Sequence, residues 1–286
     1  MARVTSESIQ AAYLSACRAD INALKPGNVS RYSPGHGMTA EQFIQSAELT
    51  AAKLVNPEQG LGKAILAAAR KTWDAVGCNT NLGILLLCTP IAHAAIACET
   101  SGEIGNVLDQ IVTGAGVEDA QAVFDAIALL KPAGLGTSDK HDVRLPAASG
   151  LFSIMQYSAG RDRIAWQYAN GFDNILSLGF DTFLCAVRES GNVDDETLEK
   201  AAVSVFFAFL SRFPDSHIAR KHGAYMAEAV RDEARDKKES FNSLQSDEAR
   251  HRFLMTYDRE LKSRGINPGT SADLTVATLF YGLLSQ

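Results

Sequence analysis

The sequence predicts an all-α fold, a multi-helix bundle with a single shared core. Apolar residues recur at helical spacing along most of the 286 residues, and strand-like alternation never persists beyond a few positions. Hydrophobic residues make up 46% of the chain. A chain of this length can bury roughly 75% of the surface that its unfolded state exposes. We therefore expect one domain over residues 1–286, although the loop at 131–146 leaves a boundary conceivable.

The helices are expected in a fixed order. The first carries Ile9, Tyr13 and Ala16 on one stripe and ends at the breaker Lys25-Pro26-Gly27. The second begins near Thr39, which forms a capping-box pattern with Gln42. Further helices are expected at 59–75, 82–98, 103–112, 117–130, 147–158, 161–169, 172–189, 201–210, 215–231, 246–263 and 270–284. The segments 82–98 and 201–210 are apolar throughout, so both should be central. The charged stretch 231–240 reads as a solvated helix end or a linker.

Composition and charge exclude several classes of protein. A net charge of -6 argues against non-specific nucleic-acid binding, which needs a basic surface. The most apolar run, Leu82 to Cys98, is interrupted by Pro90 and His93 and is short for a membrane span. Five cysteines without metal-ligand spacing are typical of free thiols in a reducing compartment. Without an apolar N-terminal segment, the protein is expected to be cytoplasmic. The sequence is compatible with either a monomer or a homodimer.

Polar residues gather first in the stretch KPGNVSRYSPGHGM, residues 25–38. Its glycines allow backbone conformations that expose N–H groups to a ligand. Lys25, Arg31 and His36 can supply positive charge or hydrogen-bond donors, and Asn28 adds an amide. The stretch is either one wall of a binding site or a surface loop with ordinary turn chemistry.

A second group, Asn79, Thr80 and Asn81, lies in GCNTNLG at 77–83, directly before the most apolar helix. One such residue is enough to cap a helix. Three in a row indicate that amides and free N–H groups face a ligand, since a helix N-terminus favours phosphate or carboxylate. Redundant capping is the alternative.

The third group lies in PDSHIARKHG at 214–223. Arg220 and Lys221 could contact a polyphosphate or form a solvated face. Asp215 could bind a ligand or simply complement the helix dipole.

The fourth group precedes the last expected helix, in NPGTSAD at 267–273. Thr270 and Asp273 match a capping box. Alternatively, Asp273 binds magnesium while the backbone around Ser271 holds an anion.

Together, and in this order, the four groups resemble the triphosphoribosyl-dephospho-CoA synthase family, nearly from end to end. The resemblance rests on KPGNV at 25–29, His36, GCNTNLG at 77–83, DSHIARKHG at 215–223 and PGTSADL at 268–274. It implies an enzyme of prosthetic-group biosynthesis in which the 2′-hydroxyl of dephospho-CoA attacks C1′ of the ATP ribose and adenine leaves. No P-loop, GxGxxG, HExxH or GxSxG motif supports another assignment.

The resemblance also implies roles for individual residues. Contacts to ATP are assigned to Lys25, Asn28, Asn79, Thr80, Asn81, Arg220, Lys221 and Ser271. Asp215 and Asp273 are expected to hold Mg²⁺, and one of them to act as a base. His36 is a further candidate for acid–base catalysis.

Several positions depart from the pattern of the citrate-lyase members. No carboxylate follows His36, because the sequence continues Gly37-Met38. Asn81 and Leu82 replace a histidine and a lysine, His217 replaces an asparagine, and the Arg-Gly-Glu element has no counterpart near 160–175. The chain looks more like a divergent branch from archaea and methylotrophic bacteria, associated with tetrahydromethanopterin-linked one-carbon metabolism. Two alternatives therefore remain. The chain could be a related enzyme with a different acceptor, such as a pterin, or a nucleotide-binding protein without catalysis.

Overall fold

The computed structural model describes residues 4–137 and 139–286. Within these ranges the chain forms fourteen α-helices, three short 3₁₀ or π segments and no strand, which confirms the predicted all-α class. The α-helices are α1 (Ser6–Asn22), α2 (Ala40–Leu54), α3 (Leu61–Val76), α4 (Leu82–Ala97), α5 (Ile104–Gly114), α6 (Val117–Leu130), α7 (Leu151–Ser158), α8 (Arg163–Ala169), α9 (Phe180–Ser190), α10 (Asp195–Leu210), α11 (Ser216–His222), α12 (Ala224–Ser243), α13 (Asp247–Ser263) and α14 (Gly269–Leu284).

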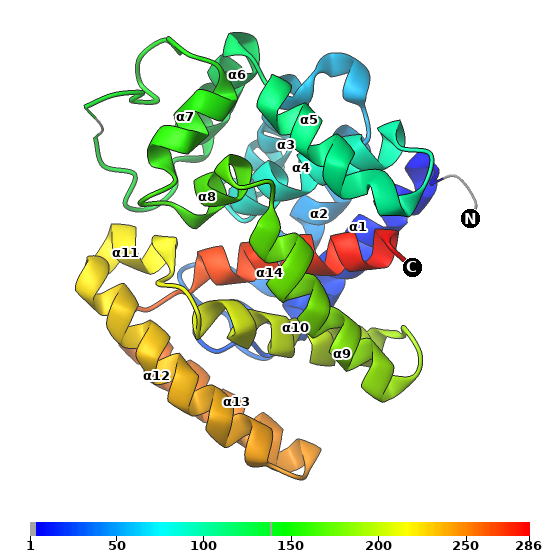
Figure 1. Ribbon diagram of the computed structural model, residues 1–286. Helices are drawn as coiled ribbons and strands as arrows, with labels where there is room; N and C mark the ends of the chain where they lie inside the picture. The colour runs from blue at the N-terminus through cyan, green and yellow to red at the C-terminus, as the bar shows by residue number, and fades with distance from the viewer. Residues whose placement is uncertain (1–3, 138) are drawn as a thin grey trace.

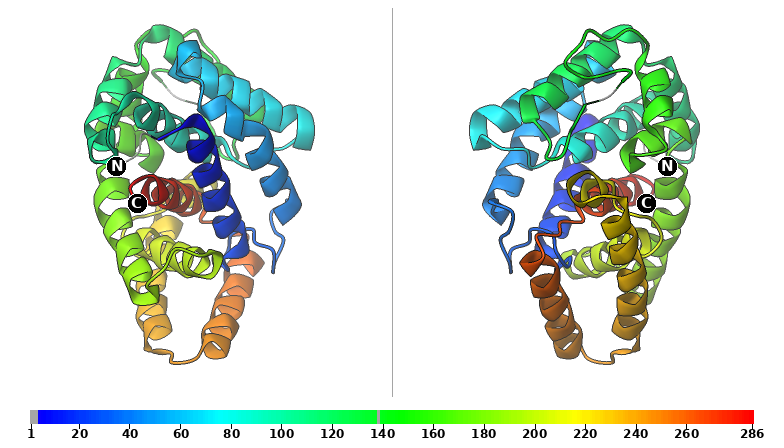
Figure 2. Two further views of the ribbon diagram at one scale, coloured as in Figure 1. Left: turned by 90° about the vertical axis from the view of Figure 1, so that its right-hand side faces the viewer. Right: turned by 90° about the vertical axis from the view of Figure 1, so that its left-hand side faces the viewer.

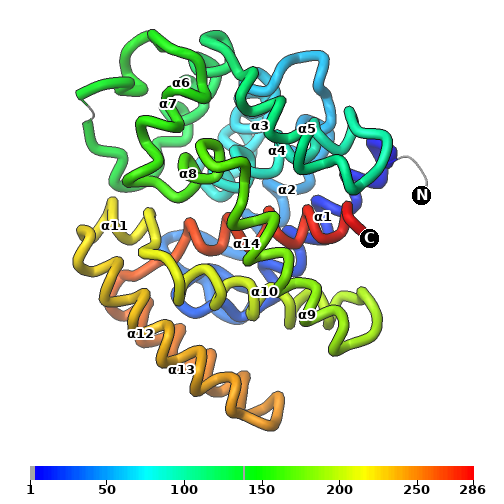
Figure 3. Tube along the Cα trace, viewed as in Figure 1, coloured from blue at the N-terminus to red at the C-terminus, as the bar shows by residue number. Residues whose placement is uncertain are grey.

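Helix α14 runs through the middle of the molecule, with α3 to α8 on one side and α9 to α13 on the other (Figures 1 and 3). It packs against α1, α4 and α10. The main hydrophobic cluster extends from Ile9 to Leu284 and draws on helices along the whole chain, so the core is shared as expected. The single domain itself stays a prediction.

The two segments expected to be central are buried. Helix α4 buries its residues on every side, and α10 buries all of Ala201–Leu210 except Ser204. The capping box at Thr39 is also confirmed, because its N–H donates to Gln42 Oε1 at 3.0 Å. No helix in the described ranges is both long enough and apolar enough to cross a bilayer.

The prediction of one helix over 215–231 is wrong, because the chain breaks at Gly223. This residue has φ of 90°, in the region that favours glycine, and it separates α11 from α12. The charged stretch 231–240 lies inside α12 and is neither a helix end nor a linker. Lys237 pairs with Glu260 of α13 at 2.9 Å, so that α12 and α13 form a charged hairpin projecting from the body (Figure 2).

Two other boundaries differ from the prediction. The segment expected at 172–189 starts as a π turn, η3 (Ile175–Gly179), before α9. A Cβ at Gly179 would lie 2.4 Å from Thr278 Oγ1, which shows how closely this turn approaches α14. The helix expected at 147–158 begins at Leu151, and the rest of the predicted loop at 131–146 is not helical; Ser138 lies outside the described residues.

Truncation of the central α10 should be costly. Phe207 is 1% exposed and stacks on Phe241 with ring centroids 5.6 Å apart. We expect Phe207→Ala to lower the free energy of unfolding by about 3–5 kcal/mol in urea titrations, because it leaves a cavity. Leu145→Ala, at a side chain that is 63% exposed, should change it by less than about 0.5 kcal/mol. Similar values for the two variants would contradict the core assignment.

Candidate active site

One cavity of about 480 Å³ lies among the described residues, within the usual range of roughly 300–1,000 Å³ for small-molecule sites. Its walls come from the C-terminal part of α1, the N-terminus of α4, helices α6, α7, α8, α11 and α14, and the loop between α6 and α7. A separate void beside Asp20 and Asn81 holds only about 10 Å³. Segments far apart in the sequence therefore converge on one space.

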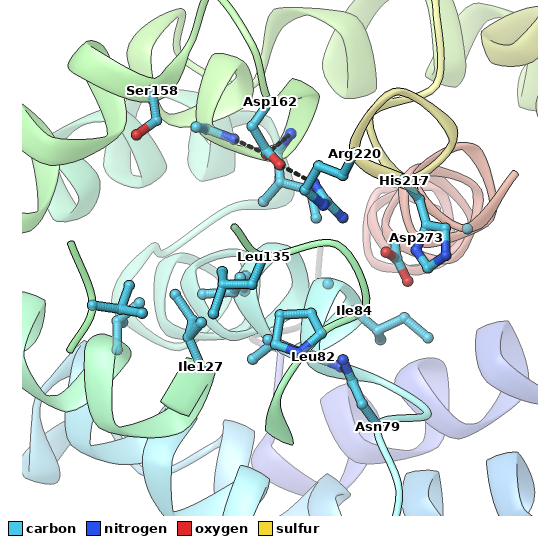
Figure 4. A pocket seen from close by; sticks show the side chains of 18 of the residues that line it. Asn79, Leu82, Ile84, Ile127, Leu135, Ser158, Asp162, His217, Arg220 and Asp273 are labelled. Carbon is cyan, nitrogen blue, oxygen red and sulfur yellow. Dashed lines mark hydrogen bonds and ion pairs between the residues drawn. The ribbon is translucent and has the colours of Figure 1, made fainter. Parts of the chain in front are cut away.

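The two sides of the cavity differ in chemistry. Asp273 and His217 lie on one side, and Ile127 and Leu135 lie on the other (Figure 4). The apolar side is completed by Val123, Phe124, Leu151, Ile154 and Met155. Such an arrangement suits a ligand with a flat apolar part and a polar or charged part.

Asp273 is the most exceptional group on the polar side. It projects from the first turns of α14 over Gly83 of α4, where a Cβ would lie 2.0 Å from its Oδ2. Within the described residues its carboxylate has neither a hydrogen bond nor an ion pair. Burial raises the pKa of this carboxyl well above its ordinary value, and the nearby negative charges of Asp215 and Asp20 raise it further. An unpartnered carboxyl in a cavity is a candidate for chemistry.

Asp215 has a structural position instead. Its Oδ1 caps α11, accepting from the N–H groups of His217 at 2.9 Å and Ile218 at 3.1 Å. Its Oδ2 accepts from Ser271, from the N–H at 2.7 Å and from the hydroxyl at 2.8 Å. With two donors on each oxygen, its acceptor capacity is filled. Asp215 and Ser271 do not line the cavity, and together they join the N-termini of α11 and α14.

The capping box expected for Thr270 and Asp273 does not form. Helix α14 begins at Gly269, so Thr270 lies inside its first turn, and its hydroxyl accepts from the N–H of His217 at 3.2 Å. Asp215 takes the N–H of Ser271 that was expected to face an anion.

The first stretch contributes less of the cavity than expected. Asn28 lines it and donates to Asn267 Oδ1 at 2.9 Å. Lys25 is fully buried behind the wall, where its Nζ lies 3.0 Å from Asp20 Oδ2 and also donates to the Asp20 carbonyl oxygen. The ring of His36 lies 2.9 Å from the carbonyl oxygen of Gly27, outside the cavity wall, and burial lowers its pKa.

Asn79, Thr80 and Asn81 all line the cavity, and their capping is not redundant. Asn79 accepts from the N–H of Leu82, the first residue of α4, at 3.1 Å, whereas the side chain of the N-cap residue Asn81 makes no capping bond. Thr80 bonds to Ser46 at 2.6 Å, and Asn81 Oδ1 accepts from Thr72 at 3.0 Å. The buried Nδ2 of Asn81 has no partner among the described residues.

The basic triplet at the end of α11 is divided. Arg220 lines the cavity and pairs with Asp162, the N-cap of α8 (Figure 4). Lys221 is exposed and outside the cavity wall, and the ring of His222 lies 3.1 Å from the carbonyl oxygen of Gly265. The reason is geometric, because successive residues of a helix point in different directions.

Sequence reasoning missed several cavity residues. Arg161 and Asp162 line the wall in the region where no charged element was expected, and Gly160-Arg161-Asp162 between two helices was the available signal. Asp20 was overlooked on the buried side of α1. Its proximity to Lys25 follows from the turn after α1, which the sequence did not specify.

With this geometry established, comparison with known proteins identifies the family. Residues 6–286 match the family model described as ATP:dephospho-CoA triphosphoribosyl transferase. The chain belongs to this family. The match confirms the predicted resemblance and places the chain among transferases of prosthetic-group biosynthesis.

A solved structure supports the fold of this triphosphoribosyl transferase family member. It is a protein from Archaeoglobus fulgidus, described as a candidate triphosphoribosyl-dephospho-CoA synthase. The TM-score is 0.65 at 20% identity, over 84% of this chain and 97% of that chain. No curated protein matches the sequence.

The residues of this transferase suit a Mg²⁺ ion bound by the protein only in part. Mg²⁺ is normally bound by one or two carboxylates together with substrate phosphates and water. Asp273 offers free carboxylate oxygens in the cavity, but those of Asp215 are already filled by hydrogen bonds. The described residues contain no group of three or more His, Cys, Asp or Glu side chains that could hold a metal.

Asp273→Asn should stabilise the protein at alkaline pH in the presence of EDTA. The folded-state pKa is raised above the unfolded value of about 3.9. The contribution of Asp273 to stability is therefore most favourable below that unfolded value and is lost as the pH rises through the folded-state pKa. We expect the variant to melt above the wild type at pH 8, with a gain that shrinks toward pH 4. An equal gain at both pH values would rule out this linkage.

Asp215→Asn should have the opposite effect. It places an amide N–H₂ group against N–H and hydroxyl donors, so buried donors lose their acceptor. We expect a loss of about 1–3 kcal/mol in the free energy of unfolding, measured by urea titration at pH 7. Unchanged stability would show that Asp215 does not join α11 to α14.

Proposed function

We propose that the chain transfers the triphosphoribosyl group of ATP to the 2′-hydroxyl of 3′-dephospho-CoA and releases adenine. The observation that carries this proposal is the unpartnered Asp273 carboxyl in the cavity of about 480 Å³. Membership of the ATP:dephospho-CoA triphosphoribosyl transferase family supports the same reaction.

The reaction breaks the bond between ribose C1′ and adenine N9 and forms a bond from C1′ to the acceptor 2′-oxygen. Asp273 takes the hydroxyl proton, and its negative charge stabilises the positive charge that develops on the sugar. Burial raises its pKa, so the carboxylate is a stronger base than a solvated aspartate. Adenine takes up one proton as it leaves, so no net proton is released.

The cavity also suits the parts of ATP. The apolar side, with Phe124 and Ile127, would hold the purine, and the amides of Asn79 and Asn81 would orient the sugar and phosphates. Arg220 would contact the triphosphate while Asp162 fixes its guanidinium. Mg²⁺, when bound, would be held mainly by the triphosphate, with Asp273 as the available protein ligand, and would supply charge neutralisation.

The same apolar wall also favours a second candidate acceptor. A flat pterin or aryl ring would also pack against Phe124, Ile154 and Met155. The chain would then catalyse the same type of transfer, with a pterin-type hydroxyl in place of dephospho-CoA.

The decisive assay supplies ATP, Mg²⁺ and dephospho-CoA and measures free adenine together with the mass of the adduct. We expect both products from the wild type and a loss of at least about 100-fold in kcat for Asp273→Asn. Asp74→Asn, at an exposed carboxylate outside the cavity, should retain full activity.

Each failure has a distinct meaning. If the protein binds ATP but releases no adenine, dephospho-CoA is rejected as the acceptor, and pterin-type acceptors are tested next. A folded protein that neither binds ATP nor releases adenine with any acceptor would contradict the proposal. Full activity in Asp273→Asn would remove Asp273 from the mechanism.

A further inference from the structure

Asp20 is a buried carboxylate that neither the sequence motifs nor the reaction above uses. It is 4% exposed and lines the main cavity. Lys25 holds its Oδ2 at 3.0 Å from behind the wall. Its Oδ1 has no hydrogen-bond partner among the described residues. Lys25 thus fixes one oxygen and leaves the other free.

Asp20 and Asp273 line the same cavity. Asp20 is close enough for its negative charge to raise the pKa of Asp273. Asp20 Oδ1 is buried without a donor, and the Asp273 carboxylate has neither a hydrogen bond nor an ion pair within the described residues. Two carboxylates that share a desolvated site repel each other, and this cost is relieved when a positive charge lies between them.

No lysine among the described residues lines the cavity to provide that charge. Two arginines do line it, but Asp162 pairs with the guanidinium of Arg220, and the guanidinium of Arg161 lies over the ring of Tyr157, 5.4 Å from its centroid. Neither is paired with Asp20 or Asp273, so a bound cation would add to the charge compensation at these two carboxylates. In the proposed reaction the species that becomes positive is the ribose ring at C1′, and it does so only in the transition state.

We infer that Asp20 is a second catalytic carboxylate, and that Asp20 and Asp273 together bind the positively charged sugar of the transition state. Lys25 is a positioning residue, because it holds Asp20 through Oδ2 and does not reach the cavity. This inference rests on the proposed function and adds the chemical class of ligand that the polar side prefers, a cationic five-membered ring.

The test compares two ligands that differ in charge. One is a 1,4-iminoribitol 5′-triphosphate, whose ring nitrogen is protonated at pH 7, and the other is its neutral tetrahydrofuran counterpart. Calorimetry in Mg²⁺ gives the ratio of their dissociation constants, in which contacts to the triphosphate cancel. We expect the wild type to prefer the cationic ligand by at least about tenfold, roughly 1.4 kcal/mol.

Asp20→Asn and Asp273→Asn should each abolish most of this preference, whereas Asp74→Asn should retain it. Since Asp20→Asn leaves the buried Lys25 unpaired and could impair folding, the double variant Asp20→Asn/Lys25→Met removes both charges together. It should fold and should also lose the preference. A wild-type ratio in any folded variant that lacks Asp20 would overturn the inference.

A titration with Mn²⁺ alone separates this site from a metal site. Binding of Mn²⁺ that depends on Asp20, without any preference for the cationic sugar, would overturn the inference in favour of a metal. The adenine assay keeps the two proposals distinct. If the wild type releases adenine but Asp20→Asn keeps the wild-type ratio of dissociation constants, only the role of Asp20 is rejected. If the wild type prefers the cationic ligand but releases no adenine with any acceptor, only the proposed reaction is rejected.

Discussion

The cavity depends on one buried carboxylate that it does not contain. Asp215 accepts four hydrogen bonds from the first turns of α11 and α14, and this fixes the two helices relative to each other. Helix α11 carries His217 and Arg220, and α14 carries Asp273. Because partly positive helix N-termini surround one negative charge, the joint is electrostatically favourable as well as fully hydrogen-bonded.

Charge is distributed unevenly around this joint. Asp215 and Asp162 are neutralised by helix N–H groups or by Arg220, and Asp20 is held on one side by Lys25. Asp273 alone has no such partner within the described structure. A protein that keeps an unpartnered carboxyl in a desolvated cavity gives up stability there, and such sites are typical of function.

The sequence analysis found the segments that build the cavity, but not the role of each residue. The polar groups at 77–83 and the acidic residue of the last helix were found because a cluster of polar residues beside an apolar helix is unusual. Lys25 and Asp215 were assigned to the ligand and instead hold the walls. Asp20 and Asp162 were missed because a single aspartate near a helix end is common in any sequence.

The sequence by itself determined the all-α class, the central helices at 82–98 and 201–210, and the family, because these depend on local periodicity and on short motifs. The tertiary structure alone decided which polar groups face the cavity. Lys25 and Asp273 are both polar residues beside apolar helices, yet one is bonded behind the wall and the other is free. That difference arises from contacts between helices distant in the chain, which local sequence patterns do not specify.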